Sequence, residues 1–226
     1  MKIISLILAS GFSLVLLGSC KNSGTSAPSP GSTASVQDLY PLKIGDSWTY
    51  HRQVLSPTGS VTFDTEDTLT LPNQITFQGQ QAFQQNLTPI DTIGTEWYYY
   101  NGSSDIYSVH HPQSDFEIAH YLHYPMKVGE SFILADDSTF ARNYDDKTVL
   151  VLRSSNESVT VPAGSFSCVY FEKYGITTTS GVVDTEMFDK LYYASGVGLV
   201  MDKGFVKSAG VTYQQSEQDL VSFMVK

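Results

Sequence analysis

Short runs in which apolar and polar residues alternate dominate this sequence and restrict the folds open to it. In residues 47–55, Trp48, Tyr50 and Val54 lie on one side of an extended chain and polar residues lie on the other. A period of two is typical of a strand with one buried face. Similar runs occur at 61–63, 67–71, 148–153, 166–174, 186–193 and 221–225. The sequence therefore predicts a mainly β protein with an antiparallel sheet and few helices.

Short segments typical of tight turns separate these runs. They are Pro57-Thr58-Gly59, Asn101-Gly102, Asp145-Asp146, Ala163-Gly164, Ser180-Gly181, Ser195-Gly196 and Lys203-Gly204. Their spacing indicates a succession of hairpins. Residues 113–123 alone have some helical periodicity, and they fit a strand equally well.

A nine-residue segment occurs twice in the chain. Residues 40–48 (YPLKIGDSW) align with residues 124–132 (YPMKVGESF) at an offset of 84, and five of the nine positions are identical. In each copy the proline keeps the preceding tyrosine extended, and the glycine permits a sharp turn. We expect the segment to act as a corner that begins a strand, with Trp48 or Phe132 entering the core.

Weaker similarity continues beyond this segment. Residues 75–77 align with 159–161 at the same offset, whereas 97–102 match 191–196 only after a shift of about nine residues. A hairpin extension at 175–183 would supply that shift. We predict two similar β units, near 38–123 and 124–226. Two copies are too few for an open solenoid, so they fit either two halves of one sheet or barrel, or two side-by-side domains.

Residues 1–19 have the order of a secretory signal. Lys2 is followed by an apolar run and then by small residues. Leu17-Gly18-Ser19-Cys20 resembles a lipobox, where signal peptidase II cleaves before an acylated cysteine. We predict that Cys20 carries acyl chains, palmitate among them, and anchors the protein in a membrane, because two or more chains hold firmly. The alternative is an ordinary secretory signal that contains a cysteine.

The residues after Cys20 indicate a tether. Residues 20–37 are rich in Ser, Gly, Pro and Thr, a composition that is typical of a flexible linker, and the β domain is expected at 38–226. In enteric-type sorting, an aspartate directly after the acylated cysteine retains a lipoprotein at the inner membrane. Lys21 stands there instead, which favours the outer membrane, with the domain facing the periplasm.

The charge balance narrows the choice of partners. The formal net charge is −10, so neither nucleic acid nor an anionic membrane surface would attract the chain. The sequence has no Gly-x-Ser-x-Gly, His-Glu-x-x-His, phosphate-loop or dinucleotide motif. We therefore expect no cofactor and no enzymatic activity.

Three kinds of residue are candidates for a site. His110, His111, His120 and His123 lie near two acidic residues and are weak candidates for a transition-metal site, although a polar surface stretch accounts for them better. Cys168 has no intrachain partner if Cys20 is acylated, and we expect it to be a small buried side chain in a strand.

Aromatic residues gather in two regions. They are Trp97, Tyr98, Tyr99, Tyr100, Tyr107, Tyr121, Tyr124, Tyr192 and Tyr193. Alternation along a strand would place about half of them in the core. The other half could stack on sugars or line the surface of a partner.

Three segments carry a resemblance to known proteins. Residues 40–50, 159–168 (VTVPAGSFSC) and 192–200 (YYASGVGLV) resemble a widespread set of uncharacterised bacterial lipoproteins and periplasmic proteins. Such proteins are loosely similar to the LolA and LolB lipoprotein carriers. This resemblance implies a half-barrel or barrel-like antiparallel sheet wrapped around a hydrophobic cavity. It implies no catalytic residues, and a shared fold does not fix function.

Three functions remain open on these grounds. The first is a non-enzymatic envelope lipoprotein whose β domain binds an acyl chain, another hydrophobic ligand or an envelope protein. The second is a structural or interaction lipoprotein with a filled core. The third is a hydrolase whose site residues are scattered among loops. An apolar cavity lined by aromatic and aliphatic side chains would favour the first.

Overall fold

The protein is mainly β, as the alternation predicts. The computed structural model describes residues 34–88, 97–110, 117–136 and 144–226, and within these it has one short helix and 13 strands. In chain order they are α1 (Val36–Leu39), β1 (Ser47–Leu55), β2 (Val61–Thr70), β3 (Gln74–Phe77), β4 (Gln80–Thr88), β5 (Trp97–Asn101), β6 (Asp105–His110), β7 (Glu117–His123), β8 (Ser131–Asp136), β9 (Tyr144–Val161), β10 (Gly164–Thr179), β11 (Val182–Ala194), β12 (Gly198–Ser208) and β13 (Val211–Met224).

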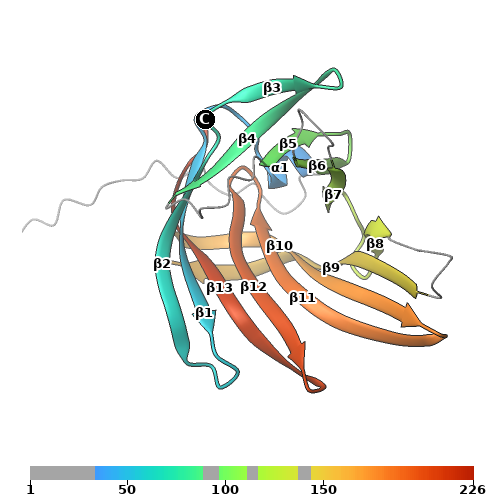
Figure 1. Cartoon of the computed structure of the whole chain (residues 1–226). Coiled ribbons are helices and arrows are strands. Elements are labelled where there is room, and N and C mark those ends of the chain that lie inside the picture. The colour runs from blue at the N-terminus through green and yellow to red at the C-terminus, as the bar shows by residue number, and fades with distance from the viewer. Residues whose placement is uncertain (1–33, 89–96, 111–116, 137–143) are drawn as a thin grey trace, which may run out of the picture.

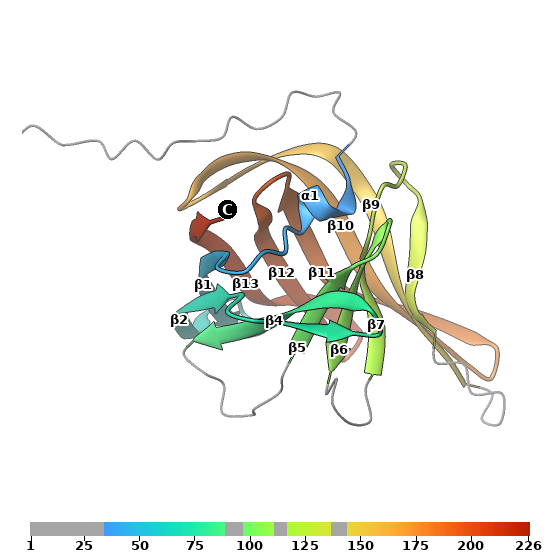
Figure 2. The same cartoon turned by 90° about the horizontal axis from the view of Figure 1, so that it is seen from above.

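All the strand pairs are antiparallel, and they join in one sheet. The order is β7-β6-β5-β4-β2-β1-β13-β12-β11-β10-β9-β8, with β3 paired to β4. The first and last strands of this order, β7 and β8, lie against each other, so the sheet curls until it is almost a closed barrel (Figures 1 and 2). The prediction of a barrel-like antiparallel sheet is confirmed.

Most of the predicted turns lie where hairpins reverse. The tip of the β10–β11 hairpin is formed by Ser180 and Gly181, both at positive φ (51° and 81°), the backbone that a two-residue hairpin of this twist needs. This tip belongs to the extension expected at 175–183. The turn signals at 57–59, 101–102, 163–164 and 195–196 also fall at or beside strand ends.

Two predicted turns are wrong. Asp145-Asp146 lies inside β9 and Lys203-Gly204 lies inside β12. A Cβ atom at position 204 would stand 2.3 Å from Ser216 Oγ on β13, so Gly204 permits a close approach of strands rather than a reversal. The chain turns instead at Ala209 and Gly210, both at positive φ.

Helix α1 closes one end of the barrel, between the β5–β7 strands and the β10–β12 strands (Figures 1 and 2). Val36 and Leu39 are fully buried in a core formed by both sides of the barrel. Hydrogen bonds fix the helix at each side: Gln37 Nε2 donates to Gly102 O (2.6 Å), and Gly196 N donates to Asp38 O (2.7 Å). The helix therefore joins the β5–β6 turn to the β11–β12 turn.

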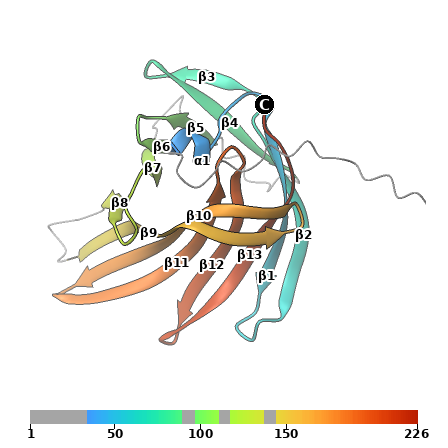
Figure 3. The ribbon, with the colours of Figure 1, turned by 180° about the vertical axis from the view of Figure 1, so that it is seen from behind.

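A second layer covers part of the outer face of the barrel. The ends of β9 and β10 around their shared turn cross over β12 and β13 (Figure 3). Ala163 N donates to Leu220 O (2.9 Å), and the rings of Phe166 and Phe223 pack edge to face. A compact cluster that includes Cys168 and Val200 is buried beneath this hairpin end.

The two copies of the nine-residue segment share the turn at 43–46 and 127–130, although the Tyr124-Pro125 bond is cis and the Tyr40-Pro41 bond is not. Gly45 (φ 87°) donates its N–H to Leu71 O at 2.9 Å, and Gly129 (φ 86°) donates to Leu152 O at 2.8 Å. Each corner begins a strand, β1 or β8, as expected. The elements that follow differ in length, since residues 75–77 belong to the four-residue β3, whereas residues 159–161 end the 18-residue β9. The repeat of two whole units stays a prediction.

The segment with mixed helix and strand character is a strand where it is described. Residues 117–123 form β7, which pairs with β6, and residues 113–116 lie outside the described residues.

Candidate ligand-binding site

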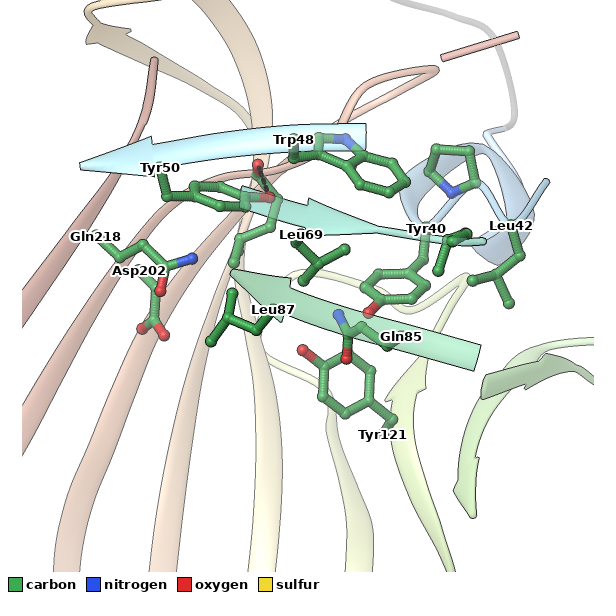
Figure 4. Close-up of a pocket in the computed structure, with 14 residues that line it drawn as sticks. Tyr40, Leu42, Trp48, Tyr50, Leu69, Gln85, Leu87, Tyr121, Asp202 and Gln218 are labelled. Carbon is green, nitrogen blue, oxygen red and sulfur yellow. Dashed lines mark hydrogen bonds between the residues drawn. The ribbon is translucent and has the colours of Figure 1, made fainter. Parts of the chain in front are cut away.

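A cavity of about 210 Å³ lies inside the barrel, next to the end that α1 closes. Its walls come from the segment after α1, from five strands that are neighbours in the sheet (β4, β2, β1, β13 and β12), and from Tyr121 on β7. Figure 4 shows aromatic and leucine side chains, among them Trp48 and Leu69, over most of its surface. Asp202 and Gln218 lie together at one side.

Two aromatic residues of β1 hold this wall in place. Trp48 Nε1 donates to Val197 O (2.6 Å), and Tyr50 Oη donates to Leu199 O (3.1 Å). Both side chains are almost fully buried. Each of these hydrogen bonds joins residues that are 149 positions apart in the sequence. Residues 40–50 and 192–200, two of the three segments that carry the resemblance, thus meet at the cavity.

The contact between Trp48 and the start of β12 requires a glycine at position 198. Its φ is +103°, and a Cβ atom there would lie 3.2 Å from Trp48 Nε1. Glycine alone among the residues adopts this backbone readily and leaves room for the indole. The backbone at position 198 and its contact with Trp48 therefore explain why the second glycine of the GVGLV segment stands there. The sequence alone does not reveal this reason.

A cluster of tyrosines forms part of the cavity wall, through Tyr40 and Tyr121. The ring of Tyr40 contacts those of Tyr99, Tyr121 and Tyr193 at centroid distances of 5.6, 5.2 and 6.3 Å. Burial raises the pKa of all four hydroxyls, so they are neutral hydrogen-bonding groups at physiological pH.

The aromatic prediction is confirmed for part of the set. Tyr98, Tyr99 and Tyr193 are buried, whereas Trp97 is 39% exposed. Tyr98 and Tyr99 are neighbours on β5, and both are buried because each face of β5 is covered. Tyr99 belongs to the main core, and Tyr98 packs in a small cluster with Phe77 and Val109. Simple alternation does not anticipate a strand covered on both faces.

The polar side of the cavity is Asp202 with Gln218. The two residues are cross-strand partners on β12 and β13. Burial raises the pKa of the Asp202 carboxyl to about 7, and the charge of Asp189 adds to this effect, while Lys173 opposes it. Lys173 itself forms an ion pair with Asp189. Sequence reasoning did not single out Asp202.

A second ion pair, between the partly exposed Arg52 and the buried Asp67, lies on the same face of the sheet as Tyr50. Asp67 is opposite Tyr50 in the β1–β2 pairing, so the two side chains share a face. Arg52, two residues on from Tyr50, places its Nε 2.5 Å from Asp67 Oδ2. Asp67 is 3% exposed, and the guanidinium compensates its charge.

The histidines do not converge as a metal site would require. His120 Nδ1 and His123 Nδ1 lie 3.2 and 2.8 Å from Asp105 Oδ1, and the ring of His123 also stacks on Phe132. His110 stacks instead on Trp97. Within the described part of the chain no group of three or more such ligands is close enough to hold a metal ion. His111 lies outside it.

Cys168 is the small buried side chain that the sequence predicts. It is in β10, is fully buried and forms no disulfide. Burial raises the pKa of its thiol to about 12, so it is a poor nucleophile.

The predicted lipidation site and residues 20–33 of the predicted linker lie outside the described residues, whereas Val36 and Gln37, at the end of that predicted linker, belong to α1. Cys20 is among residues 1–33, of which the structure gives no description. Among the residues described, no helix is long and apolar enough to cross a membrane.

Known proteins are similar to this chain in sequence over one region and in overall arrangement. Residues 151–215, which include Gly198 and Asp202, match the model of a family described as DUF3108-like. No curated protein matches the chain. The motif resemblance and the likeness to LolA and LolB stay predictions.

Two crystal structures have a similar arrangement. One is described as an exported protein with a YmcC-like fold, from Bacteroides fragilis; its TM-score is 0.47, its identity is 15%, and the match covers 82% of this chain and 98% of that one. The other is described as a lipoprotein from Parabacteroides distasonis, with a TM-score of 0.46, 16% identity and the same coverage. Neither description names an activity.

Proposed function

We propose that this chain is a lipoprotein of the bacterial cell envelope whose barrel binds a small hydrophobic molecule. The observation that carries the proposal is the cavity of about 210 Å³ with its aromatic and leucine lining. Apolar, concave sites with a few polar groups are typical places for small ligands. The cavity supports this function over that of an interaction module with a filled core.

The size of the cavity limits the ligand. An engineered apolar cavity of about 150 Å³ binds benzene, and sites for drug-sized molecules have volumes of about 300 Å³ or more. The site therefore suits a single aromatic ring or a short alkyl chain, or one end of a longer lipid.

Anchoring is the second part of the proposal. The signal and the lipobox-like segment support acylation of Cys20, and Lys21 supports the outer membrane, with the barrel facing the periplasm. The lipid chains would hold the barrel at a membrane surface, where hydrophobic molecules are concentrated.

A small aromatic ligand tests binding. We would titrate the mature chain, residues 20–226 with Cys20→Ser, with toluene in a calorimeter, because a single ring matches the size of the cavity. Leu87 lines the cavity yet is 38% exposed, so Leu87→Trp should fill the site without unfolding the barrel. We expect saturable binding that Leu87→Trp weakens at least tenfold.

The matched control is Val182→Trp, at the tip of the β10–β11 hairpin, where Val182 is 70% exposed. It adds the same side chain away from the cavity and should leave binding unchanged. Absence of saturable binding, or equal loss in both variants, would refute the binding site.

Membrane fractionation tests the anchor. The parent chain should sediment with outer membranes, and Cys20→Ser, exported behind a signal that does not need an acylated cysteine for its cleavage, should appear in the periplasmic fraction. Retention of Cys20→Ser in the membrane, after cleavage of its signal, would contradict lipid anchoring.

A further inference from the structure

One carboxylate in the cavity wall has a buried oxygen atom without a hydrogen-bond donor among the described residues. Asp202 lines the cavity, and its Oδ1 atom is buried from solvent. Among the residues that the structure describes, none donates a hydrogen bond to this atom. A buried polar atom of this kind is unfavourable unless something pairs with it.

The cations on this face of the sheet are already paired. Lys173 is engaged by Asp189, and Arg52 is engaged by Asp67. Lys173, whose charge acts on Asp202, is therefore already paired with another acid. Asp202, Asp189 and Lys173 together carry one negative charge in excess when Asp202 is ionised, and a buried charge is stable only with a partner.

The remaining neighbours suit a cation. Gln218, opposite Asp202, offers a neutral amide, and the ring of Tyr50 lies in the same cavity wall. The Tyr50 hydroxyl already donates to Leu199 O, so it does not satisfy the carboxylate. Aromatic rings attract ammonium groups through their faces, and more strongly where water is excluded.

We propose that the cavity binds an amphiphile with one positive charge, such as an alkyl amine, whose ammonium group pairs with Asp202. Its apolar part lies against Trp48, Leu69 and Leu87. This inference rests on the proposed function and adds the charge of the ligand.

The protonation behaviour of Asp202 agrees with this geometry. Burial holds its pKa near 7, so the carboxyl is poised between its two forms near neutral pH. An approaching ammonium group favours the ionised form. The carboxylate would then bring selectivity against anionic ligands, because two like charges would share a poorly solvated space.

Three probes with one chain length test the inference. Calorimetric titrations at pH 8 would compare octylamine, 1-octanol and octanoate on the mature chain with Cys20→Ser. A close pair of opposite charges at an interface raises the affinity by about tenfold or more. We therefore expect octylamine to bind at least about tenfold more tightly than octanol, and octanoate to bind most weakly.

Two variants separate the carboxylate from the rest of the cavity. Asp202→Asn removes the charge and keeps the shape, and it should bring the octylamine and octanol affinities within about twofold of each other. The control is Asp184→Asn, which removes an acid whose side chain is 63% exposed on the β11 hairpin, and it should keep the preference for octylamine.

The outcomes distinguish the two proposals. Equal affinities for octylamine and octanol in the parent, or a preference that survives in Asp202→Asn, would overturn the cationic ligand and leave hydrophobic binding intact. Binding of none of the three probes would overturn the proposed function as well.

Discussion

Replacing Asp202 by asparagine should make the protein more stable at alkaline pH. The folded chain holds a proton on Asp202 up to a pKa of about 7, whereas an unfolded chain releases it near 3.8. Between these values the native state binds more protons than the unfolded state, so its stability falls as the pH rises. The contribution is fully present below the unfolded pKa and is lost as the pH passes the folded one.

The shift sets the magnitude. About three pKa units correspond to about 4 kcal/mol, of which about 3 kcal/mol is lost between pH 5 and pH 8. Asparagine resembles the protonated carboxyl in shape and charge, so Asp202→Asn and the parent should be similar at low pH. The groups facing Asp202 that add to or oppose the effect are Asp189 and Lys173, and both remain in the variant.

Urea unfolding followed by tryptophan fluorescence measures this difference. Mature chain refolded from urea, free of ligand, would be unfolded at pH 5 and at pH 8. The gain in unfolding free energy from Asp202→Asn should be about 3 kcal/mol larger at pH 8 than at pH 5. Asp184→Asn removes an exposed acid whose pKa is lowered by Lys207, and it should show no such gain. A gain from Asp202→Asn that is the same at both pH values would refute the reasoning.

Three further predictions concern the motif residues and the thiol. Trp48→Phe removes the hydrogen bond to Val197 O and leaves that buried oxygen unpaired, so urea unfolding should show a loss of about 1–3 kcal/mol. Gly198→Ala forces alanine into a positive φ against the indole, and the same assay should show a loss of about 1–3 kcal/mol; an unchanged midpoint would contradict the packing argument. Cys168 should react with a chromogenic disulfide reagent at pH 8 only after the protein is unfolded, and rapid labelling of the native chain would show that the thiol is accessible.

The sequence predicts the strands well because their signal is local. Alternation in residues 47–55 corresponds to β1, with Trp48 and Tyr50 buried. Helix α1 was missed, although Ser35 and Asp38 form a capping box at its start, because four residues give no helical period. The signal that could have found it is the S-x-x-D spacing before Leu39.

The candidate site was beyond local reasoning. The cavity unites residues 40–50 with residues 198–218, and only the pairing of β1 with β13, which are far apart in the sequence, brings these segments together. An aspartate in the run Leu199 to Phe205 is a visible departure from an apolar strand. Its direction, however, depends on a bulge between Tyr192 and Tyr193 in the β11–β12 pairing, and a shift of one residue reverses the face that every later side chain occupies.

The residues that carry the resemblance and the residue that would set the charge of the ligand are different. Trp48, Val197 and Gly198 belong to the resembling segments, and their contacts fix β1 to the start of β12. Asp202 and Leu87 also line the cavity, but they lie outside those segments. A protein with the same segments would therefore share the barrel without sharing the ligand. A relative with an apolar residue at the position of Asp202 should prefer octanol to octylamine, and a cationic preference in such a relative would show that the ammonium group binds elsewhere.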